Sequence, residues 1–452
     1  MPQMSYYQME LPFKDRGEAP NVERSEETSM ADRGIECPGA LGLLAAVLGR
    51  RNLHAALKRV KQNKGSAGID GMTVEELPDY LREHWESLRE ELIEGTYRPQ
   101  PVKQQEIPKP GGGTRELGIP TVLDRFVQQA LLQVLQPLID PSFSEHSYGF
   151  RPGRRAQDAV RCAQGYIQEG RHWVVDVDLE KFFDRVNHDV LMDRLSRHIS
   201  DKPVLRLIRL YLEAGILVNG VKVDRYEGTP QGGPLSPLLA NVLLDEVDKE
   251  LERRSHCFVR YADDCNVYVR SRRAGERVMS WLRQAFARLH LRVNESKSAV
   301  ERAHRRSFLG FSFWFGAKGV VKRRLSPQAK QAMKTRVRQI TRRSRGRSLE
   351  QIAVQLRSYL LGWKGYFRLA ETPSVFRELD QWIRHRLRAI QLKHWKRGRT
   401  IYRELRARGL SHDAARQVAA NSRRWWRNSG KKIHIALPNA LFDQLGVPRL
   451  AT

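Results

Sequence analysis

Two pairs of acidic residues interrupt stretches that otherwise have the pattern of buried β-structure. The stretch WVVDVDL alternates like a strand and places Asp176 and Asp178 on the same side. The stretch CFVRYADDCNVYV has the pattern of an apolar hairpin with Asp263 and Asp264 at its turn. A carboxylate on a buried strand is costly unless it is paired or bound to a cation. The fold must therefore bring these acids to a place where positive charge can reach them.

Side-by-side placement of these strands would bring three or four carboxylates together. Such a group binds hard divalent cations through oxygen, as Mg²⁺ requires. Two ions about 3.5–4 Å apart would activate a 3′-hydroxyl and stabilise a leaving pyrophosphate. The alternative is a set of aspartates that only make turns and cap helices, because Asp is a common turn residue. The residues alone leave both interpretations open.

The order of apolar patterns predicts a mixed fold. Strands alternate with helices, but not as regular βαβ repeats, which favours an α+β sheet backed by helices. Helical spacing of apolar residues predicts helices over 41–61 and 121–139. Residues 107–120, rich in Gly and Pro, and the Asn-Gly pair at 219–220 predict hairpins.

Beyond Ser326 the pattern is helical, with helix starts predicted at Ser326-Pro327, Thr372-Pro373 and the Ser348 capping box. The helix that begins at Thr372-Pro373 has one apolar stripe, and three arginines lie among the residues of this stripe. The stripe comprises Phe376, Leu379, Ile383, Leu387 and Ile390, and the arginines are Arg384, Arg386 and Arg388. We expect a helical bundle that packs on one side and faces phosphates on the other.

The chain is strongly basic: 79 Lys and Arg face 51 Asp and Glu, so the formal net charge is +28. The excess is concentrated in residues 318–408, where 26 Lys and Arg and 5 Asp and Glu leave a net charge of +21. Such a field attracts polyanions, and nucleic acid is the favoured partner. An anionic membrane is the alternative, but no stretch approaches the roughly 18 uninterrupted apolar residues of a membrane span. We expect no membrane partner.

The four cysteines form no CxxC pair and no Cys/His cluster with zinc spacing, which is typical of small buried residues in a reducing compartment. The N-terminus is polar and lacks a secretory signal. Residues 1–36 hold 8 acidic and 4 basic residues with little periodicity, which predicts a mobile acidic tail over residues 1–40. We expect a cytoplasmic protein.

Seven motifs in order resemble the reverse transcriptase/maturases encoded by bacterial group II introns, over roughly residues 50–430. The motifs are IPKPGGGTRELGIPTVLDR, SYGFRPGRRAQDAV, DVDLEKFFDRVNHD, EGTPQGGPLSPLLANVLLDEVD, RYADD, LRVNESKS and FLGFSF. Many relatives end in an H-N-H endonuclease with zinc-spaced cysteines. This sequence has none, so it is similar to the compact type that lacks the endonuclease.

The resemblance implies three catalytic aspartates that bind two Mg²⁺ ions. RYADD supplies Asp263 and Asp264. In this family the first metal-binding aspartate stands five residues before an aromatic residue. Asp178 and Phe183 fit that spacing, so the resemblance favours Asp178 over Asp176 as the third ligand.

The resemblance also implies residues that bind the incoming deoxynucleotide. Phe183 is expected to act as a steric gate that leaves no room for a ribose 2′-hydroxyl, with simple core packing as the alternative. Lys109 and Arg115 flank the PGGGT turn and are expected to grip the triphosphate. Gln231 of PQGG is expected to lie against the nucleotide, and Lys297 of NESKS near the active site.

The implied architecture is a right-hand polymerase. Fingers and palm are expected over residues 41–318, a helical thumb or maturase domain over 319–400, and a small basic DNA-binding segment over 401–452. The expected function is RNA-directed DNA polymerisation, together with binding of intron RNA to assist splicing and target-primed reverse transcription for mobility. The partners would be group II intron RNA, an RNA template–DNA primer duplex, target DNA and dNTPs. Two alternatives stay open: a splicing maturase without polymerase activity, and a domesticated reverse transcriptase in DNA repair or phage defence.

Overall fold

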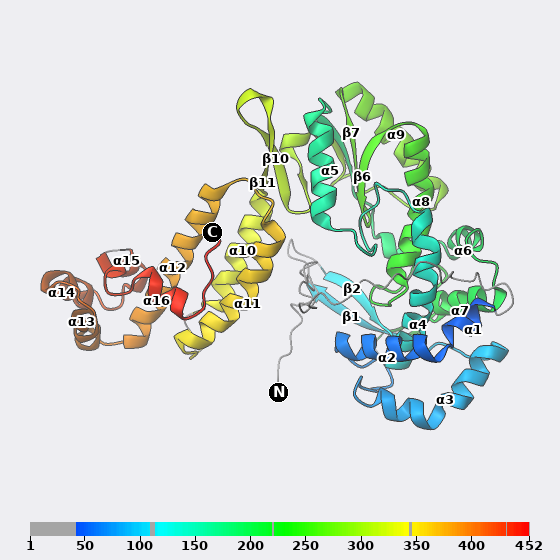
Figure 1. The fold of residues 1–452 in the computed structure, drawn as a ribbon, viewed down its shortest axis with the longest axis horizontal. Helices are drawn as coiled ribbons and strands as arrows, with labels where there is room; N and C mark the ends of the chain where they lie inside the picture. The colour runs from blue at the N-terminus through cyan, green and yellow to red at the C-terminus, as the bar shows by residue number, and fades with distance from the viewer. Residues whose placement is uncertain (1–41, 109–113, 219–220, 343–345, 431, 452) are drawn as a thin grey trace, which may run out of the picture. The chain divides into compact units, whose positions relative to one another are not determined.

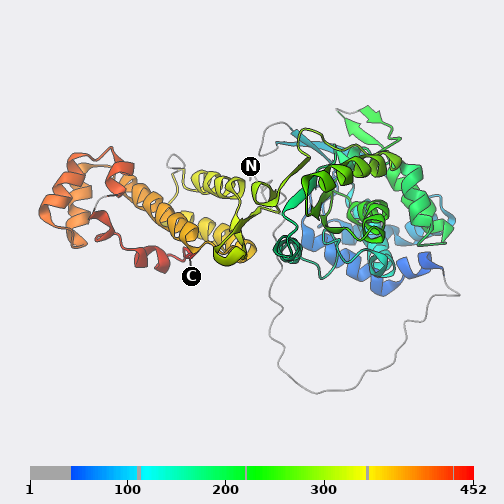
Figure 2. The same cartoon turned by 90° about the horizontal axis from the view of Figure 1, so that it is seen from above.

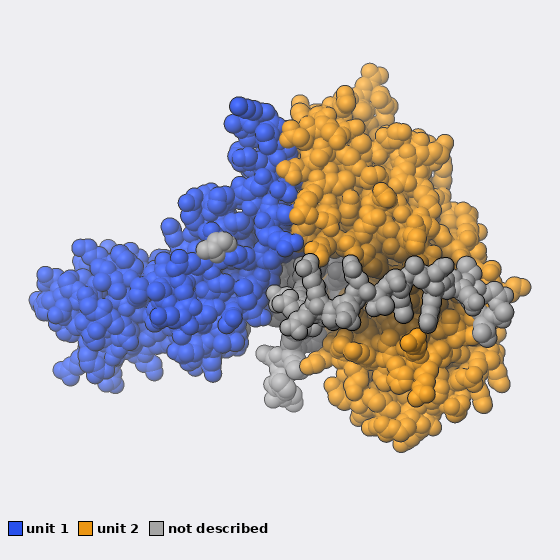
Figure 3. Space-filling view, viewed as in Figure 1, with its two compact units in different colours: residues 1–25, 307–452 blue, residues 26–306 orange. Residues whose placement is uncertain are grey.

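The chain forms two compact units, which Figure 3 shows in different colours. Unit 2 ends at Arg306, and unit 1 continues from Ser307. The computed structural model describes residues 42–451 except 109–113, 219–220, 343–345 and 431. The predicted mobile tail therefore lies outside the described residues. The functional domain boundaries inferred from the motifs stay a prediction.

An antiparallel sheet of four strands forms the centre of unit 2, in the order β6-β7-β3-β8 (Figure 1). Its strands are β3 Trp173–Val177, β6 Cys257–Tyr261, β7 Asp264–Val269 and β8 Ala299–Arg302. The central pair is β3 and β7, and β6 and β7 form the predicted hairpin. The strand and the hairpin that carry the aspartates are thus confirmed, and they are neighbours.

Helices cover both faces of this sheet. On one face, Tyr166 of α5 (Ala156–Gln168) contacts Tyr268 of β7, with ring centroids 5.9 Å apart. On the other face lie α8 (Ser236–Arg253) and α9 (Arg272–Arg288). A Cβ at Gly275 of α9 would lie 2.5 Å from a methyl group of Val300 on β8. Glycine at this position therefore lets α9 approach the sheet closely.

A second sheet of unit 2 has the order β2-β1-β4-β5. Its strands are β1 Val102–Pro108, β2 Thr114–Ile119, β4 Ile216–Val218 and β5 Val221–Val223. The pairs β1–β2 and β4–β5 are antiparallel, which confirms both predicted hairpins, although their turns lie outside the described residues. The strand β1 joins the two hairpins by pairing in parallel with β4.

The first helices of the chain differ in part from the prediction. The predicted helix over 121–139 is confirmed as α4 (Val122–Ile139), and the Thr121 side chain accepts a hydrogen bond from the Asp124 N–H (3.0 Å) at its start. The single helix predicted over 41–61 is wrong. Two helices form instead, because Gly49 takes an extended conformation with ψ 133° between them. The remaining helices of unit 2 are α1 Leu43–Val47, α2 Arg50–Asn63, α3 Leu77–Glu94, α6 His188–Ser196 and α7 Lys202–Glu213.

Unit 1 combines a small sheet with a series of helices, coloured yellow to red in Figure 2. The strands are β9 Ser307–Phe308, β10 Phe311–Phe315 and β11 Val321–Leu325, in the order β11-β10-β9. The helices are α10 Pro327–Ile340, α11 Leu349–Phe367, α12 Pro373–Trp395, α13 Gly398–Ala407, α14 His412–Ala420, α15 Trp425–Ser429 and α16 Asn439–Gln444. Within the described part of the chain, every helix is too short or too polar to cross a membrane.

The predicted helix starts of unit 1 are confirmed. Ser326 accepts a hydrogen bond from the Ala329 N–H (3.1 Å), and Ser348 forms the full capping box with Gln351. The helix α12 begins at Pro373 as expected, but the Thr372 side chain makes no capping hydrogen bond. Proline at the first turn, which needs no amide donor there, therefore marks this start without a cap.

The arginines of α12 correct one expectation. Arg384 does not face phosphates: its side chain is 3% exposed. It donates to Asp443 Oδ1 (3.0 Å) and to the carbonyl oxygens of Val447 (3.0 Å) and Pro448 (3.1 Å). Arg388 likewise donates to the carbonyl oxygen of Leu437 (2.9 Å). Backbone carbonyls accept from these arginines, so the two side chains hold the segment after α15 against α12.

Replacement of Arg384 by methionine is expected to destabilise unit 1 by about 2–4 kcal/mol, because buried carbonyl groups lose their donor. Thermal or urea unfolding of the full chain measures this change. Arg377→Met, on the exposed surface of the same helix, serves as the control and should change stability by less than about 0.5 kcal/mol. Equal stability of both variants would contradict the structural role of Arg384.

Candidate active site

The acidic residues gather at one end of the central sheet of unit 2. The register between β3 and β7, extended by one residue beyond its last pair, places Asp178 opposite Asp264. Ala262 and Asp263 form the two-residue turn between β6 and β7. Ala262 has a φ of 58°, which residues with side chains rarely adopt. The strand and the hairpin thus deliver the predicted catalytic aspartates to one place.

Negative charge accumulates around Asp264. The residue is exposed, but the surrounding protein still removes much of the water from its carboxyl group. The negative charges of Asp263, Asp176 and Asp178 further disfavour its ionised form. These effects raise the pKa of Asp264 to about 7, and Lys297 opposes them. A carboxylate group with this excess of negative charge favours the binding of cations.

Lys297 lies beside the first of these aspartates. Its Nζ is 3.1 Å from Asp178 Oδ2. The loop that carries it is fixed to the end of β3, because the Asn294 N–H donates to the Asp178 carbonyl oxygen (2.8 Å) and the Asp178 N–H donates to Ser298 Oγ (3.0 Å). The Lys297 side chain is 65% exposed, so the pair adds little to stability. Its position at the carboxylates agrees with the placement expected from the motif.

Asp176 has a different partner. Arg306 donates from Nε to Asp176 Oδ2 (2.6 Å) and from Nη2 to the Lys297 carbonyl oxygen (2.5 Å). Burial raises the pKa of Asp176, and the neighbouring Arg306 opposes this shift. The ion pair engages Asp176, whereas Asp178 lies at the end of the strand beside Asp264. Each of the two aspartates thus has a cationic partner, and the choice of Asp178 over Asp176 as a metal ligand stays a prediction.

The carboxylates do not form a complete metal-binding group in this arrangement. Across the described ranges, no three His, Cys, Asp or Glu side chains are placed to hold one ion together. The donor set nevertheless fits Mg²⁺, because it offers carboxylate oxygens from two neighbouring strands and an excess of negative charge.

Phe183 lies in the short 3-10 helix Phe182–Asp184 that follows β3. Its residue is 7% exposed, and its ring packs against Phe182 with centroids 5.0 Å apart. Gly228, with a φ of 92°, approaches the Phe183 carbonyl oxygen so closely that a Cβ would lie 3.1 Å away. Phe183 is thus held firmly from two sides, and its ring also belongs to the core. Its role as a steric gate stays a prediction.

Gln231 lies in the loop that contains Gly228 and Thr229. The Thr229 N–H donates to the Phe183 carbonyl oxygen (2.7 Å), and the Gly118 N–H donates to the Gln231 carbonyl oxygen (3.0 Å). The loop is therefore anchored between the 3-10 helix and β2. These bonds link two of the predicted nucleotide-binding residues through the backbone.

Of the two predicted triphosphate-binding cations, the structure describes only the backbone of Arg115. Lys109 lies outside the described residues. The backbone of Arg115 belongs to β2, where it pairs with Ile107. The predicted roles of both cations stay predictions.

The basic surface of unit 1 includes a tryptophan surrounded by cations. Lys334 and Arg338 of α10 and Arg386 of α12 lie 5.7, 5.6 and 5.4 Å from the ring centroid of Trp382. An aromatic face attracts such cations, although Lys334 also pairs with Glu378 (3.3 Å) and Arg386 donates to Thr341 Oγ1 (2.6 Å). By contrast, Trp363, Tyr366 and Phe367 of α11 are buried and pack against one another, as expected for core residues.

Two arginines beside the site, Arg306 and Arg260, are absent from the motif-based predictions. Arg260 interrupts the apolar strand CFVRY, and it pairs with Asp248, which stands in an apolar part of α8. An arginine in a buried strand and an aspartate in a buried helix are each costly unless they meet. This pattern in the sequence could have indicated the pairing of Arg260 with Asp248. No comparable signal in the sequence indicated Arg306, because its partner Asp176 lies 130 residues away.

Two family models match the chain. Residues 107–313 match the reverse transcriptase (RNA-dependent DNA polymerase) family, and with the sheet and aspartates described above this part of the chain is a reverse transcriptase domain. Residues 330–409 match the group II intron, maturase-specific domain. The chain therefore belongs to the group II intron-encoded reverse transcriptase/maturases, as its motifs indicated.

Curated relatives match parts of the chain. The chain is 39% identical over 209 residues to protein YkfC of Escherichia coli, which covers 45% of this chain and 55% of that protein. It is 36% identical over 197 residues to the group II intron-encoded protein LtrA of Lactococcus lactis, covering 43% of this chain and 33% of that protein. A putative COX1/OXI3 intron 1 protein of Saccharomyces cerevisiae is 31% identical over 262 residues, or 55% of this chain and 31% of that protein. The matched part of the chain thus spans about a third to a half of these three relatives.

Proposed function

We propose that the protein is an RNA-directed DNA polymerase that works with two Mg²⁺ ions. The observation that carries this proposal is the meeting of Asp178, Asp263 and Asp264 at one sheet end, where burial and the neighbouring carboxylates raise the pKa of Asp264 to about 7. When bound by these carboxylates, Mg²⁺ would supply the positive charge that activates a 3′-hydroxyl and stabilises a leaving pyrophosphate.

Other side chains of the chain would bind and orient the nucleotide. Lys297 supplies a positive charge beside Asp178. Gln231 and Phe183 are tied together by the loop after Gly228, so they would contact the base and sugar of a dNTP as one rigid element. Arg115 and Lys109 would neutralise the triphosphate.

Unit 1 would bind group II intron RNA and support splicing as a scaffold. Its concentration of cations and the group around Trp382 suit contact with phosphates and unpaired bases. The polymerase site would then copy the RNA from a primer in target DNA, which is target-primed reverse transcription. An RNA template–DNA primer duplex would be the immediate substrate, and the bacterial cytoplasm beside the nucleoid the place of action.

Primer extension on an RNA template with dNTPs and Mg²⁺ tests the proposal. We expect extension by the wild type and none by Asp263→Ala/Asp264→Ala, while both proteins bind RNA equally in a filter assay. Extension by the double variant would refute the assignment of the aspartates. Tight RNA binding without extension by either protein would instead identify a splicing scaffold.

Phe183→Ala is expected to increase incorporation of ribonucleotides relative to deoxynucleotides by about 10- to 100-fold, because the ring would no longer exclude the 2′-hydroxyl. Single-nucleotide incorporation with dNTP and rNTP pairs measures the ratio. Phe182→Ala is the matched control, since Phe182 is a buried neighbour of the same size. A selectivity ratio that both variants leave unchanged would show that Phe183 only packs in the core.

A further inference from the structure

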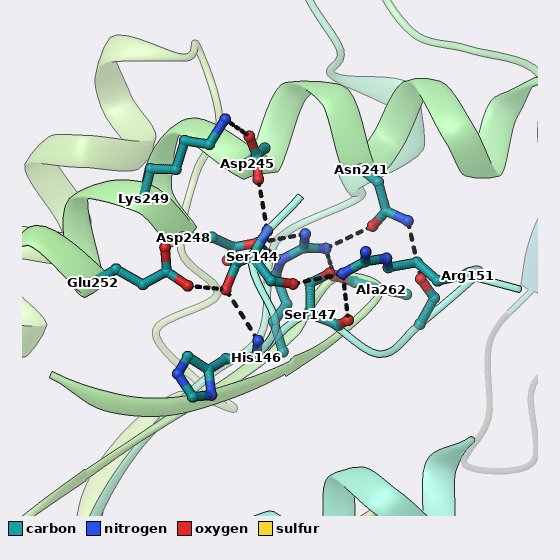
Figure 4. A network of polar contacts seen from close by, with 12 residues as sticks. Ser144, His146, Ser147, Arg151, Asn241, Asp245, Asp248, Lys249, Glu252 and Ala262 are labelled. Carbon is teal, nitrogen blue, oxygen red and sulfur yellow. Dashed lines mark hydrogen bonds and ion pairs between the residues drawn. The ribbon is translucent and has the colours of Figure 1, made fainter. Parts of the chain in front are cut away.

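A buried ion pair lies next to the turn that carries the aspartates (Figure 4). Arg260 of β6 is 2% exposed, and Asp248 of α8 is fully buried. Arg260 Nε lies 2.9 and 2.8 Å from the two carboxylate oxygens, and Nη2 lies 2.6 Å from Oδ2. Charges buried this deeply are tolerated only when geometry and hydrogen bonding are good on both sides. The remaining nitrogen of the guanidinium shows what the pair does.

That nitrogen, Arg260 Nη1, donates to the carbonyl oxygen of Ala262 (3.0 Å) and to Asn241 Oδ1 (2.8 Å). Ala262 is the residue with the unfavourable φ of 58°, and Asp263 follows it directly. A residue in such a conformation persists only where its surroundings hold it. The guanidinium therefore fixes the peptide group that joins Ala262 to Asp263.

A second contact closes the turn from another side. A Cβ at Gly149 would lie 2.2 Å from the backbone nitrogen of Ala262, so the two backbones touch. Asn241 Nδ2 donates to the Gly149 carbonyl oxygen (2.9 Å). Asn241 thus connects the guanidinium to the segment that presses on the turn, and the turn has little room to shift.

Arg260 does not share a face of the sheet with the carboxylates. In the hairpin it pairs with Cys265, and its side chain points toward α8. Asp264 directly precedes Cys265 on β7, and its side chain points to the opposite face, because side chains alternate along a strand. Arg260 therefore cannot contact metal or substrate directly, and it can act only through the turn.

We propose that Arg260 is a positioning residue of the polymerase site, which holds Asp263 and Asp264 in the geometry that binds metal. This inference rests on the proposed polymerase function. Stability alone does not explain the pair, because apolar residues of similar volume in place of a buried ion pair are often neutral or stabilising. The specific gain is the contact with the Ala262 carbonyl group.

The test uses the full chain with Arg260→Met/Asp248→Leu, which removes both charges and keeps the volume. We expect a folded protein with unchanged RNA binding, a primer-extension rate about 100-fold lower, and a higher Mg²⁺ concentration at half-maximal rate. The KM for dNTP should change much less than kcat. A wild-type rate and Mg²⁺ dependence in the folded double variant would overturn the proposal.

A control removes an ion pair that joins α6 to α8 of the same unit, Arg194 with Glu246. Arg194→Met/Glu246→Leu should keep the Mg²⁺ dependence of the wild type. An equal shift in this variant would show a general effect on the fold and overturn the proposal. If Arg260→Met/Asp248→Leu does not fold, Arg260→Lys replaces it, since lysine cannot reach Asp248 and Ala262 together. A wild-type Mg²⁺ dependence of Arg260→Lys overturns the proposal as well.

Binding of Mn²⁺, followed by electron paramagnetic resonance without nucleic acid, separates this inference from the proposed function. We expect the Arg260→Met/Asp248→Leu variant to bind Mn²⁺ about 10-fold more weakly than the wild type. If the wild type extends no primer but the variant still loses Mn²⁺ affinity, the polymerase function fails and the positioning role stands. If the wild type extends primers and both proteins bind Mn²⁺ equally, the positioning role fails and the polymerase function stands.

Discussion

Asp178→Asn is expected to lower the rate of primer extension by at least roughly 10³-fold, because a ligand to the catalytic cations loses its charge. The change keeps the size of the side chain, so folding and RNA binding should persist. Single-turnover extension in Mg²⁺, with RNA binding measured in parallel, checks both expectations.

Asp176→Asn is the matched control two residues earlier on the same strand. Its partner is Arg306, and an amide can still accept a hydrogen bond from the guanidinium. We expect a loss of no more than about 10-fold. A larger loss in Asp176→Asn than in Asp178→Asn would reverse the assignment of the first metal ligand.

Affinity for intron RNA is expected to fall by about 10³-fold or more between 50 and 200 mM salt, because cations that neutralise phosphates release counterions. Lys334→Ala/Arg338→Ala should reduce the slope of log K against log salt by about 2 and weaken binding, since these cations flank Trp382. Filter binding over a salt series measures the slopes.

A control for net charge removes two exposed arginines of unit 2, Arg253 and Arg272. Arg253→Ala/Arg272→Ala lowers the formal charge equally but should leave the slope of the wild type. A flat salt response of the wild type would contradict the basic surface of unit 1 as the site of RNA binding. Equal salt slopes for the two double variants would show that Lys334 and Arg338 beside Trp382 do not belong to the RNA-binding surface.

Much of the central fold follows from local patterns. The strand with Asp178 and the hairpin with Asp263 and Asp264 are visible as alternating apolar residues, and an acidic pair in such a hairpin already requires a cation. The helix α4 and the capped helices of unit 1 follow from helical spacing and from serine at their starts. These features depend on neighbours in sequence, so a sequence suffices to predict them.

The rest depends on contacts between distant segments. The break between α1 and α2 at Gly49 has no strong local signal, because glycine is tolerated inside helices. The inward direction of Arg384 depends on carbonyl groups about 60 residues later in the chain. The Arg306–Asp176 pair spans 130 residues. Charge pattern alone predicted a phosphate-facing side for the bundle, but it cannot show which cations have internal partners.

The buried contacts of Arg384 also set the order of folding steps during protein synthesis. The carbonyl groups of Val447 and Pro448, and the Leu450 N–H that donates to Asp380 (2.9 Å), complete the surface of α12. While these residues are still inside the ribosome, the Arg384 guanidinium lacks the carbonyl acceptors that it has in the finished fold. Unit 1 therefore cannot reach its finished form until residues 447–450 have emerged. The RNA binding proposed for unit 1 would then follow this last folding step.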